Sequence, residues 1–232
     1  MMNEVWHVQQ VDWFQELSPE ETEKLRRASV ANDYGPGEMV FSPEPRPRSV
    51  YLLEAGRVRI FRLSPTGSET TFGYVTPGEV FGELAGLGDY PRESFAQTVS
   101  KSRAWKIPRM AFQQLLKRQP RVILAITRQI GARLKRIESR VEDLAFRDVR
   151  SRVAHVLLEL AEDFGRRDDE GLVIETPPRQ GELATLVGST RQTVNATLRE
   201  LETEGLIGRR QRRIVLRRPE ALRLVAVSAP DS

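Results

Sequence analysis

The sequence predicts an α+β chain with a β-rich N-terminal part, a long helix and a C-terminal part of short helices. Three observations support this fold class. Short β-branched and aromatic runs, separated by glycine and proline, fill residues 34–107. Apolar residues repeat every seven positions after Pro120. Residues 180–202 carry two short amphipathic helical patterns on either side of a glycine.

The first expected element is a short helix that follows Ser18 and ends at about Ala31. Ser18 is a suitable cap, and Pro19 suits the first helical position. Glu21, three residues after the serine, completes a capping box.

Strands are expected at 49–53, 57–63 and 70–75, with glycine-containing turns between them. Residues 57–63 alternate basic and apolar side chains, which is typical of a strand with one face in water. Several short strands at regular spacing predict an antiparallel sandwich or a small barrel.

The long helix carries isoleucine or leucine at one seam position of successive heptads, and threonine, leucine and valine at the other. This pattern favours a two-stranded parallel coiled coil, and therefore a homodimer. The alternative is a helix that packs on its own domain. The expected dimer residues are Ile123, Ile130, Leu134, Ile137, Val141 and Leu144.

The C-terminal part begins with a predicted helix whose apolar face comprises Val149, Val153, Leu157, Leu160 and Phe164. His155 lies in this helix without another histidine or a cysteine near it, so we interpret it as a structural residue. The charged segment from Gly165 to Gly171 is expected to be a loop.

Residues 180–202 predict a helix-turn-helix. The apolar side of its first helix comprises Leu183, Ala184, Leu186 and Val187. Gly188 supplies the turn, and Ser189 is expected to cap the second helix in a box with Gln192. The core-facing positions of the second helix are Val194, Leu198 and Leu201, which leaves Arg191, Gln192, Asn195 and Arg199 on the outer face.

These outer residues are of the types that read base edges, because arginine pairs with guanine and Asn or Gln with adenine. A purely structural helical hairpin is the alternative. Apolar runs at 205–208 and 214–216 flank an arginine-rich tip, which predicts a β-hairpin wing laid against phosphates. The tip lacks the glycine that tight hairpin turns prefer.

Composition excludes several classes of protein. The 232 residues contain no cysteine, which excludes disulfides, cysteine metal sites and thiol nucleophiles. The histidines are His7 and His155, too few for a histidine-rich metal centre or an obvious catalytic triad. No apolar run is long enough to span a membrane, and no signal peptide is evident, so we expect a cytoplasmic protein without a membrane partner.

Charge is distributed unevenly along the chain. Residues 1–108 hold 12 basic and 15 acidic residues, whereas 109–146 hold 9 and 3. Residues 205–224 contain seven arginines and a single glutamate. Such concentration of basic residues indicates a polyanion bound by one part of the molecule; a solvated charged surface is the alternative.

Four features carry a family resemblance: Gly78-Glu-Val-Phe-Gly-Glu-Leu84 after the strands, Arg92, Leu144-Ala-Phe146 and Val187-Gly-Ser-Thr-Arg-Gln-Thr-Val194. With them the chain resembles the cyclic-AMP receptor protein and FNR (CRP/FNR) superfamily of bacterial transcription regulators, from Ser18 to about Leu224. The resemblance implies a cyclic-nucleotide-binding-like β-roll over 1–108, a dimerisation helix over 109–146 and a winged helix-turn-helix over 147–232.

In this family the two recognition helices of a dimer enter successive major grooves about 34 Å apart, which implies an inverted-repeat site on double-stranded DNA. The resemblance assigns Arg191 to a base. Gln192 replaces the family's usual glutamate and Ala196 another contacting arginine, so the half-site sequence stays open. The expected DNA-binding residues are Arg179, Gln180, Ser189, Thr190, Arg191, Gln192, Thr193, Asn195, Arg199, Arg209, Arg210, Arg212 and Arg213.

The resemblance also marks an effector pocket, whose candidate residues are Gly82, Glu83, Arg92, Glu93 and Arg133. In relatives that bind cyclic AMP, the glutamate accepts from the ribose and the arginine, followed by Ser or Thr, holds the phosphate. Here Glu93 follows the arginine and would repel a phosphate if it pointed inward. Ile137 and Glu138 replace the hydroxyl residues expected on the helix.

We therefore favour a regulator that acts without cyclic AMP, either constitutively competent or tuned by an unknown ligand, and we expect no cofactor. Cyclic-AMP control is the alternative, and Glu83 and Arg92 could also form a simple structural pair. A cupin-type enzyme would need clustered metal ligands, and residues 34–107 contain no histidine. A cyclic-nucleotide-binding regulatory subunit would have no use for the helix-turn-helix. We expect no catalytic and no metal site, and RNA polymerase as a further partner, with 165–171 as a candidate contact. The sequence does not distinguish an activator from a repressor.

Overall fold

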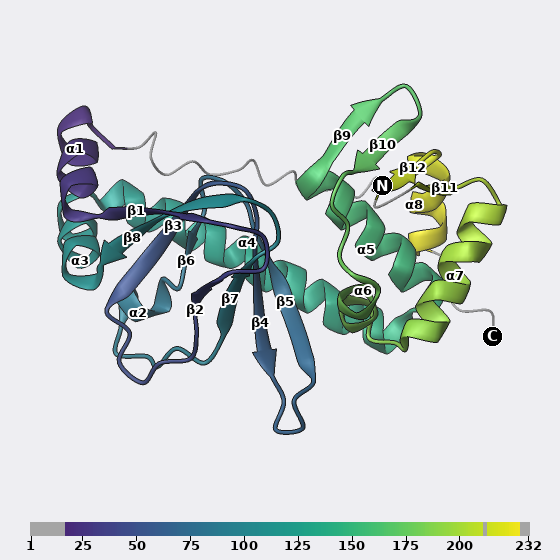
Figure 1. The fold of residues 1–232 in the computed structure, drawn as a ribbon, viewed down its shortest axis with the longest axis horizontal. Coiled ribbons are helices and arrows are strands. Elements are labelled where there is room, and N and C mark those ends of the chain that lie inside the picture. Colours follow the sequence, from purple (N-terminus) through teal and green to yellow (C-terminus); the bar gives the residue numbers. More distant parts are fainter. Residues whose placement is uncertain (1–16, 211–212, 228–232) are drawn as a thin grey trace. The chain divides into compact units, whose positions relative to one another are not determined.

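The structure is a computed structural model and describes residues 17–210 and 213–227. Arg212, expected in the wing, and His7 lie outside the described residues. The chain forms two compact units, residues 1–62 with 72–135 and residues 63–71 with 136–232, which we describe separately (Figure 1). Within the described part, no helix is long and apolar enough to cross a membrane.

The first unit is built on two four-stranded sheets. One contains β1 (Val30–Tyr34), β8 (Ser102–Pro108), β3 (Ser49–Ala55) and β6 (Val80–Phe81), in that order. The other contains β2 (Met39–Phe41), β7 (Phe95–Thr98), β4 (Val58–Leu63) and β5 (Glu69–Val75). The strand pairs with a described register are antiparallel, which confirms the β-rich, antiparallel architecture expected for this half.

Four helices accompany these sheets: α1 (Pro19–Ala28), α2 (Leu84–Leu87), α3 (Arg109–Arg118) and α4 (Pro120–Phe146). The Ser18 hydroxyl caps α1 by accepting from the Glu21 N–H at 3.3 Å. The expected helix end at about Ala31 was too late, because Val30 and Ala31 already pair with β8.

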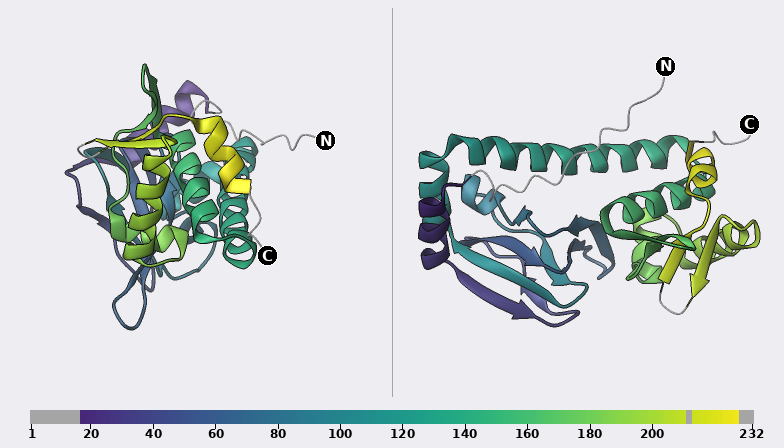
Figure 2. Two further views of the ribbon diagram at one scale, coloured as in Figure 1. Left: turned by 90° about the vertical axis from the view of Figure 1, so that its right-hand side faces the viewer. Right: turned by 90° about the horizontal axis from the view of Figure 1, so that it is seen from above.

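The helical segment after the strands is two helices and not one. Gln119 has a φ of −127° and ends α3, and Pro120 begins α4. A proline cannot continue the hydrogen bonding of a preceding helix, and it disfavours a helical conformation at the residue before it. Figure 2 shows α4 as one unbroken helix from there to Phe146.

The first unit has two apolar clusters, one on each face of the β3 sheet. Tyr51 and Leu53 belong to the cluster shared with Phe41 of β2 and Phe81 of β6. Leu52 belongs to the other cluster, together with side chains of α1, α3 and α4. The alternation along β3 follows from the period-2 geometry of a strand, so the sheet is covered by helices on one face and by the second sheet on the other.

The expectation of a water-exposed basic face on β4 was wrong at Arg59. This side chain is 4% exposed, stacks over Phe61 at 4.2 Å and donates to Gln97 at 2.7 Å. Leu63, which the alternation placed on the apolar face, is instead 47% exposed.

The second unit contains a four-stranded sheet and short helices. Its elements in order are α5 (Val149–Phe164), β9 (Gly165–Asp168), β10 (Gly171–Ile174), α6 (Gln180–Val187), α7 (Arg191–Thr203), β11 (Ile207–Arg210), β12 (Arg213–Leu216) and α8 (Pro219–Val227). The sheet order is β11-β12-β10-β9. The expected apolar face of α5 is confirmed, since Val153, Leu157 and Leu160 are buried.

The prediction of a loop over residues 165–171 was wrong. Residues 165–168 form β9, an edge strand paired with β10, so that Arg167 lies opposite Leu172. Charged side chains suit an edge strand because one side of its backbone is unpaired and its side chains reach water.

Candidate nucleic-acid interface and effector site

The helix-turn-helix depends on a left-handed residue at the end of α6. Gly188 has a φ of 66°, and the N–H of Ser189 donates to the Ala184 carbonyl at 3.0 Å. A Cβ atom at Gly188 would stand 2.3 Å from a methyl carbon of Leu144, on α4. Glycine is therefore favoured at this turn by its backbone conformation, and a Cβ there would also require the exposed Leu144 side chain to move.

The second helix begins one residue later than expected. Thr190 is its cap, and its hydroxyl accepts from the Thr193 N–H at 3.1 Å. The predicted cap at Ser189, with Gln192 closing the box, was wrong. Serine and threonine are both good caps, and after the αL turn at Gly188 the threonine is the residue that directly precedes α7.

The predicted core face of α7 is confirmed. Val194, Leu198 and Leu201 are at most 2% exposed. On the opposite side, Arg191, Gln192, Thr193 and Arg199 are exposed, as are Arg179, Gln180 and Thr190 at the adjoining helix starts. Ser189 is partly buried.

Two of these polar residues have intramolecular partners. The Asn195 side-chain amide is partly buried and donates to Oε1 of the Gln180 side chain at 3.0 Å, which links α7 to the first turn of α6. The Arg191 guanidinium lies so close to Gly181 that a Cβ atom there would stand 2.5 Å from it. Gly181, which the sequence did not single out, therefore leaves room for the side chain expected to contact a base.

The wing is a hairpin of β11 and β12, in which Arg210 lies opposite Arg213. Each of its three described arginines contacts a glutamate. Arg209 pairs with Glu202 of α7 at 2.8 Å, Arg210 with Glu170 at 3.0 Å and Arg213 with Glu175 at 2.7 Å. The Arg209 hydrogen bond lowers the pKa of Glu202, so this pair is charged at neutral pH.

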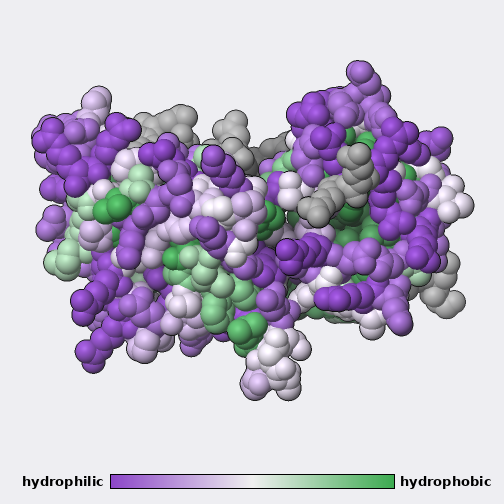
Figure 3. All heavy atoms as spheres, in the orientation of Figure 1, coloured by the Kyte–Doolittle hydropathy of each residue, from purple (hydrophilic) through white to green (hydrophobic). Residues whose placement is uncertain are grey.

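The sequence found the arginines of the wing and missed the glutamates that hold them. Glu175 also contacts Arg166 of β9 at 3.0 Å. Figure 3 shows hydrophilic side chains over the β9–β10 hairpin that supplies part of this network. The three described wing arginines are therefore engaged with carboxylates of the same unit.

The candidate effector residues converge on a buried arginine in the first unit. Arg92 donates to the Ser49 carbonyl at 2.6 Å and stacks over Phe41 at 4.1 Å. Gly82, with a φ of 68°, leaves room for it, since a Cβ there would stand 3.0 Å from the guanidinium. Burial lowers the pKa of Arg92 from its usual value. Its nearest ion-pair contact in the described chain is Glu44 at 3.9 Å.

Glu83 pairs with a different arginine. Its carboxylate lies 3.4 Å from Arg133 of α4, which also donates to the Val80 carbonyl at 2.8 Å. The alternative of a Glu83–Arg92 pair was therefore wrong. Gln129, one turn earlier on α4, accepts from the Val80 N–H at 3.0 Å and donates to the Val80 carbonyl at 2.6 Å. Gln129 lies among buried residues of α4, and a polar residue at such a position was the sequence signal for its hydrogen bonds to Val80.

Glu93 turns away from the protein interior. Its carboxylate pairs with Arg62 at 2.5 Å, and both side chains are more than half exposed. The repulsion that an inward-pointing Glu93 would exert on a phosphate is therefore absent from this conformation.

The apolar row on α4 is largely uncovered in the single chain. Its exposed members, with exposed fractions between 40% and 61%, are Ile123, Leu134, Ile137, Val141 and Leu144. Ile130 is partly buried against the core of the first unit, on the side where Val122 and Ile126 are fully covered. The helix therefore packs on its own domain through one face and leaves most of the seam free.

His155 of α5, which the sequence assigned a structural role, links this helix to the C-terminal part of α4. Its Nδ1 atom contacts the carboxylate of Asp143, a residue 3% exposed. This hydrogen bond raises the pKa of His155. Among the described residues, no group of three or more His, Cys, Asp or Glu side chains could hold a metal ion.

Comparison with known proteins agrees with both halves of the structure. Residues 31–119 match the cyclic nucleotide-binding domain, and residues 151–225 match the Crp-like helix-turn-helix domain. The chain is 34% identical to the CRP-like cAMP-activated global transcriptional regulator of Mycobacterium tuberculosis over 195 residues, 84% of this chain and 87% of that protein.

Solved structures give the same assignment. A CRP/FNR-family transcriptional regulator of Thermus thermophilus superposes with a TM-score of 0.71 at 29% identity, covering 86% of this chain and 99% of that one. The c-di-GMP responsive global regulator CLP of Xanthomonas campestris gives 0.74 at 26% identity, with the same coverage. These relatives are transcription regulators and not enzymes. The chain therefore belongs to the CRP/FNR family of transcription regulators and carries that family's DNA-binding helix-turn-helix domain.

Proposed function

We propose that this protein regulates transcription as a homodimer that binds an inverted-repeat DNA site. The observation that carries the proposal is the row of exposed polar side chains on α7, Arg191, Gln192 and Arg199, opposite a fully buried apolar face. Arginine and glutamine are donors suited to base edges, and the nearby wing arginines are suited to phosphates. The half-sites would lie about 34 Å apart, one turn of the double helix.

The dimer part of the proposal is supported by the uncovered row on α4. Residues such as Leu134 and Val141 are more than half exposed at heptad spacing, and burying such a row stabilises a coiled coil. Light scattering on the full chain tests this directly. A dimer that becomes a monomer on Leu134→Glu is expected, and a monomeric wild-type protein would refute it.

We propose three functional parts of the chain. The expected parts are an effector-type domain over 1–108, a dimerisation helix over 109–146 and a DNA-binding domain over 147–232. Phe112 and Leu115 of α3 are buried in the core of the first unit, so we assign the dimerisation role to α4 alone.

Selection of bound sequences from a random DNA pool would identify the half-site, and Arg191→Ala then tests the base contact. Loss of one bidentate pair is expected to cost roughly 1–3 kcal/mol and to relax one base position. Arg223→Ala is the matched control, because Arg223 is an exposed arginine on α8 outside the helix-turn-helix. Equal affinity and selectivity of Arg191→Ala and wild type would refute the assignment.

The proposal includes activity without cyclic AMP. In support, Glu83 is engaged by Arg133, and Arg92 by the Ser49 carbonyl and aromatic rings. Ile137 and Glu138 supply no hydroxyl group for an adenine. Family relatives respond to different small molecules, as the names of the cAMP-activated and c-di-GMP responsive regulators state, so membership does not specify cyclic AMP.

Control by cyclic AMP is the second candidate function, and a specific observation favours it. The Nε atom of Arg92 is buried without a hydrogen-bond partner in the described chain, and no carboxylate lies closer than Glu44 at 3.9 Å. A buried, weakly compensated cation is suited to an anion. Calorimetry of the full chain with cyclic AMP and cyclic GMP distinguishes the two, since micromolar binding that tightens DNA affinity would establish the second candidate.

RNA polymerase is the further partner that we propose. The tip of the β9–β10 hairpin is exposed at Asp169 and Glu170. Transcription from a selected site with purified polymerase tests this contact. Asp169→Ala is expected to change transcription without changing DNA affinity, and parallel changes in both would argue against a separate polymerase contact.

A further inference from the structure

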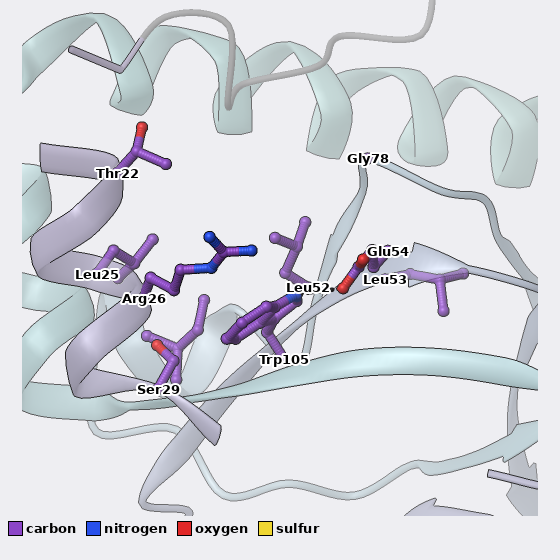
Figure 4. A pocket seen from close by; sticks show the side chains of 10 residues that line it. Thr22, Leu25, Arg26, Ser29, Leu52, Leu53, Glu54, Gly78 and Trp105 are labelled. Atoms are coloured by element: carbon purple, nitrogen blue, oxygen red, sulfur yellow. Dashed lines mark hydrogen bonds between the residues drawn. The ribbon is translucent and has the colours of Figure 1, made fainter. Parts of the chain in front are cut away.

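A cavity of about 360 Å³ lies between α1 and the face of the β3–β8 sheet that α1 covers (Figure 4). This volume is typical of sites for small organic ligands. The cavity does not include the candidate effector residues among its lining residues. Arg92 packs against Tyr51 on the opposite face of β3, so the cavity and the effector site are separated by the sheet.

The floor of the cavity is apolar. Leu25 of α1, Leu52 of β3 and Ile107 of β8 line it, and each is at most 5% exposed. The ring of Trp105 lies beside them and is partly buried. These side chains offer a hydrocarbon and aromatic surface of the kind that binds the apolar body of a ligand.

Arg26, an exposed residue of α1, supplies the positive charge among the residues that line the cavity. Its guanidinium extends from α1 into the cavity, 5.6 Å from the centre of the Trp105 ring (Figure 4). Within the described part of the chain it forms no ion pair, although its neighbours Lys24 and Arg27 pair with Glu20 and Glu23. An arginine above an aromatic ring is well placed to hold a carboxylate by two hydrogen bonds.

The other polar groups of the cavity are also consistent with an anionic ligand. The Glu54 carboxylate accepts from the Trp105 indole at 2.6 Å and lies 3.4 Å from Arg103, so its charge is compensated and the indole is held in place. The Ser29 hydroxyl is buried and has no hydrogen-bond partner among the described residues. One cation and one hydroxyl therefore retain unused hydrogen-bonding capacity.

We propose that this cavity binds a small organic monoanion, an aryl or short alkyl carboxylate, independently of the effector site. The carboxylate contacts Arg26, and the apolar body lies against Trp105 and Leu52. Such a site would give the N-terminal domain a small-molecule input on the face of its sheet opposite Arg92.

The test uses the full-length protein and 4-(trifluoromethyl)phenylacetate as the probe, followed by fluorine NMR. Saturable binding with a Kd below about 1 mM is expected, with weaker binding of the corresponding neutral amide. Arg26→Gln is expected to weaken binding of the acid by about tenfold and to leave the amide unchanged, since it removes a charge-assisted hydrogen bond. Arg27→Gln is the matched control, because Arg27 is the adjacent arginine on α1 and pairs with Glu23.

A second readout locates the probe. The Trp105 indole N–H resonance, assigned with Trp105→Phe, is expected to shift on addition of the acid. Three outcomes would overturn the proposal: no saturable binding to wild type, equal weakening by Arg26→Gln and Arg27→Gln, or displacement of the probe by cyclic AMP. None of these measurements involves DNA, so their failure would leave the proposed function untouched.

Discussion

Glu175→Gln is expected to strengthen the binding of duplex DNA. The Glu175 carboxylate lies 2.7 Å from Arg213 of the wing and 3.0 Å from Arg166 of β9. An arginine held in this way must exchange a carboxylate for a phosphate when it contacts DNA. Replacing the glutamate by the nearly isosteric glutamine removes that competition and one negative charge beside the proposed phosphate-binding surface.

The size of the effect follows from the exposure of the pairs. The side chains of Glu175, Arg213 and Arg166 are 34%, 53% and 63% exposed, so solvent screens both pairs. Pairs of this kind contribute roughly 0.2–1 kcal/mol. The expected gain is therefore about 1.4-fold to fivefold in affinity. Each additional phosphate contact would steepen the dependence of log K on log salt by about 0.9.

Fluorescence anisotropy with a labelled duplex, between about 50 and 200 mM salt, measures both quantities. A non-specific duplex suffices, because phosphate contacts do not depend on base sequence. Glu220→Gln is the matched control: it makes the same charge change within the same unit but releases Arg223 of α8. Unchanged affinity and salt slope for Glu175→Gln, or an equal gain for Glu220→Gln, would refute the competition between carboxylate and phosphate.

Three further predictions concern stability. Gly188→Ala is expected to lower the free energy of unfolding by roughly 1–2 kcal/mol because the backbone is left-handed there, with a further loss from contact with Leu144. In chemical denaturation, adding Leu144→Ala should relieve only the loss from that contact. Complete relief would contradict the backbone contribution. Thr190→Ala is expected to lower the free energy of unfolding by about 1 kcal/mol because the cap of α7 is lost, whereas Ser189→Ala should lower it much less. The reverse order would identify Ser189 as the cap. The raised pKa of His155 means that its bond to Asp143 stabilises the fold fully below the unfolded pKa of about 6.5 and is lost as pH rises through the folded pKa. His155→Gln should remove this pH dependence from the unfolding free energy, and an unchanged pH profile would show that His155 is not its source.

The local sequence was sufficient to predict a structural feature where it allowed only one interpretation. The apolar positions of α7 predicted its buried face because helical spacing leaves no other arrangement for Val194, Leu198 and Leu201. The residue that caps α7 could not be predicted from sequence alone, because Ser189 and Thr190 are adjacent and chemically equivalent caps. The conformation of Gly188 decided between them, and that conformation depends on how α6 meets α7.

Residues 165–171 show a different limit. Their charge and flanking glycines are typical of a loop, yet four of them form β9. Pairing with β10 supplies the backbone hydrogen bonds, so the side chains need no strand propensity of their own. Edge strands of this kind are poorly visible to periodicity because neither face must be apolar.

Ionic partners were the least predictable part of the candidate sites. Glu83 pairs with Arg133, fifty positions away along the chain, and Arg210 pairs with Glu170, forty positions away. Nothing in local spacing distinguishes these carboxylates from the other acidic residues. Glu93 illustrates the consequence, since its position beside Arg92 in sequence suggested a repulsion that its contact with Arg62 removes.

The sequence by itself determined the order of the two domains, the buried faces of their helices and the helix-turn-helix, because these depend on periodicity and on residues such as Gly188. It also predicted which residues contact DNA. Only the tertiary structure decided the intramolecular partners of those residues: Asn195 bonds to Gln180, and Arg209, Arg210 and Arg213 of the wing bond to glutamates. The physical reason is that burial patterns arise from short-range geometry, whereas electrostatic pairing is selected among many equivalent partners by the long-range packing of the chain.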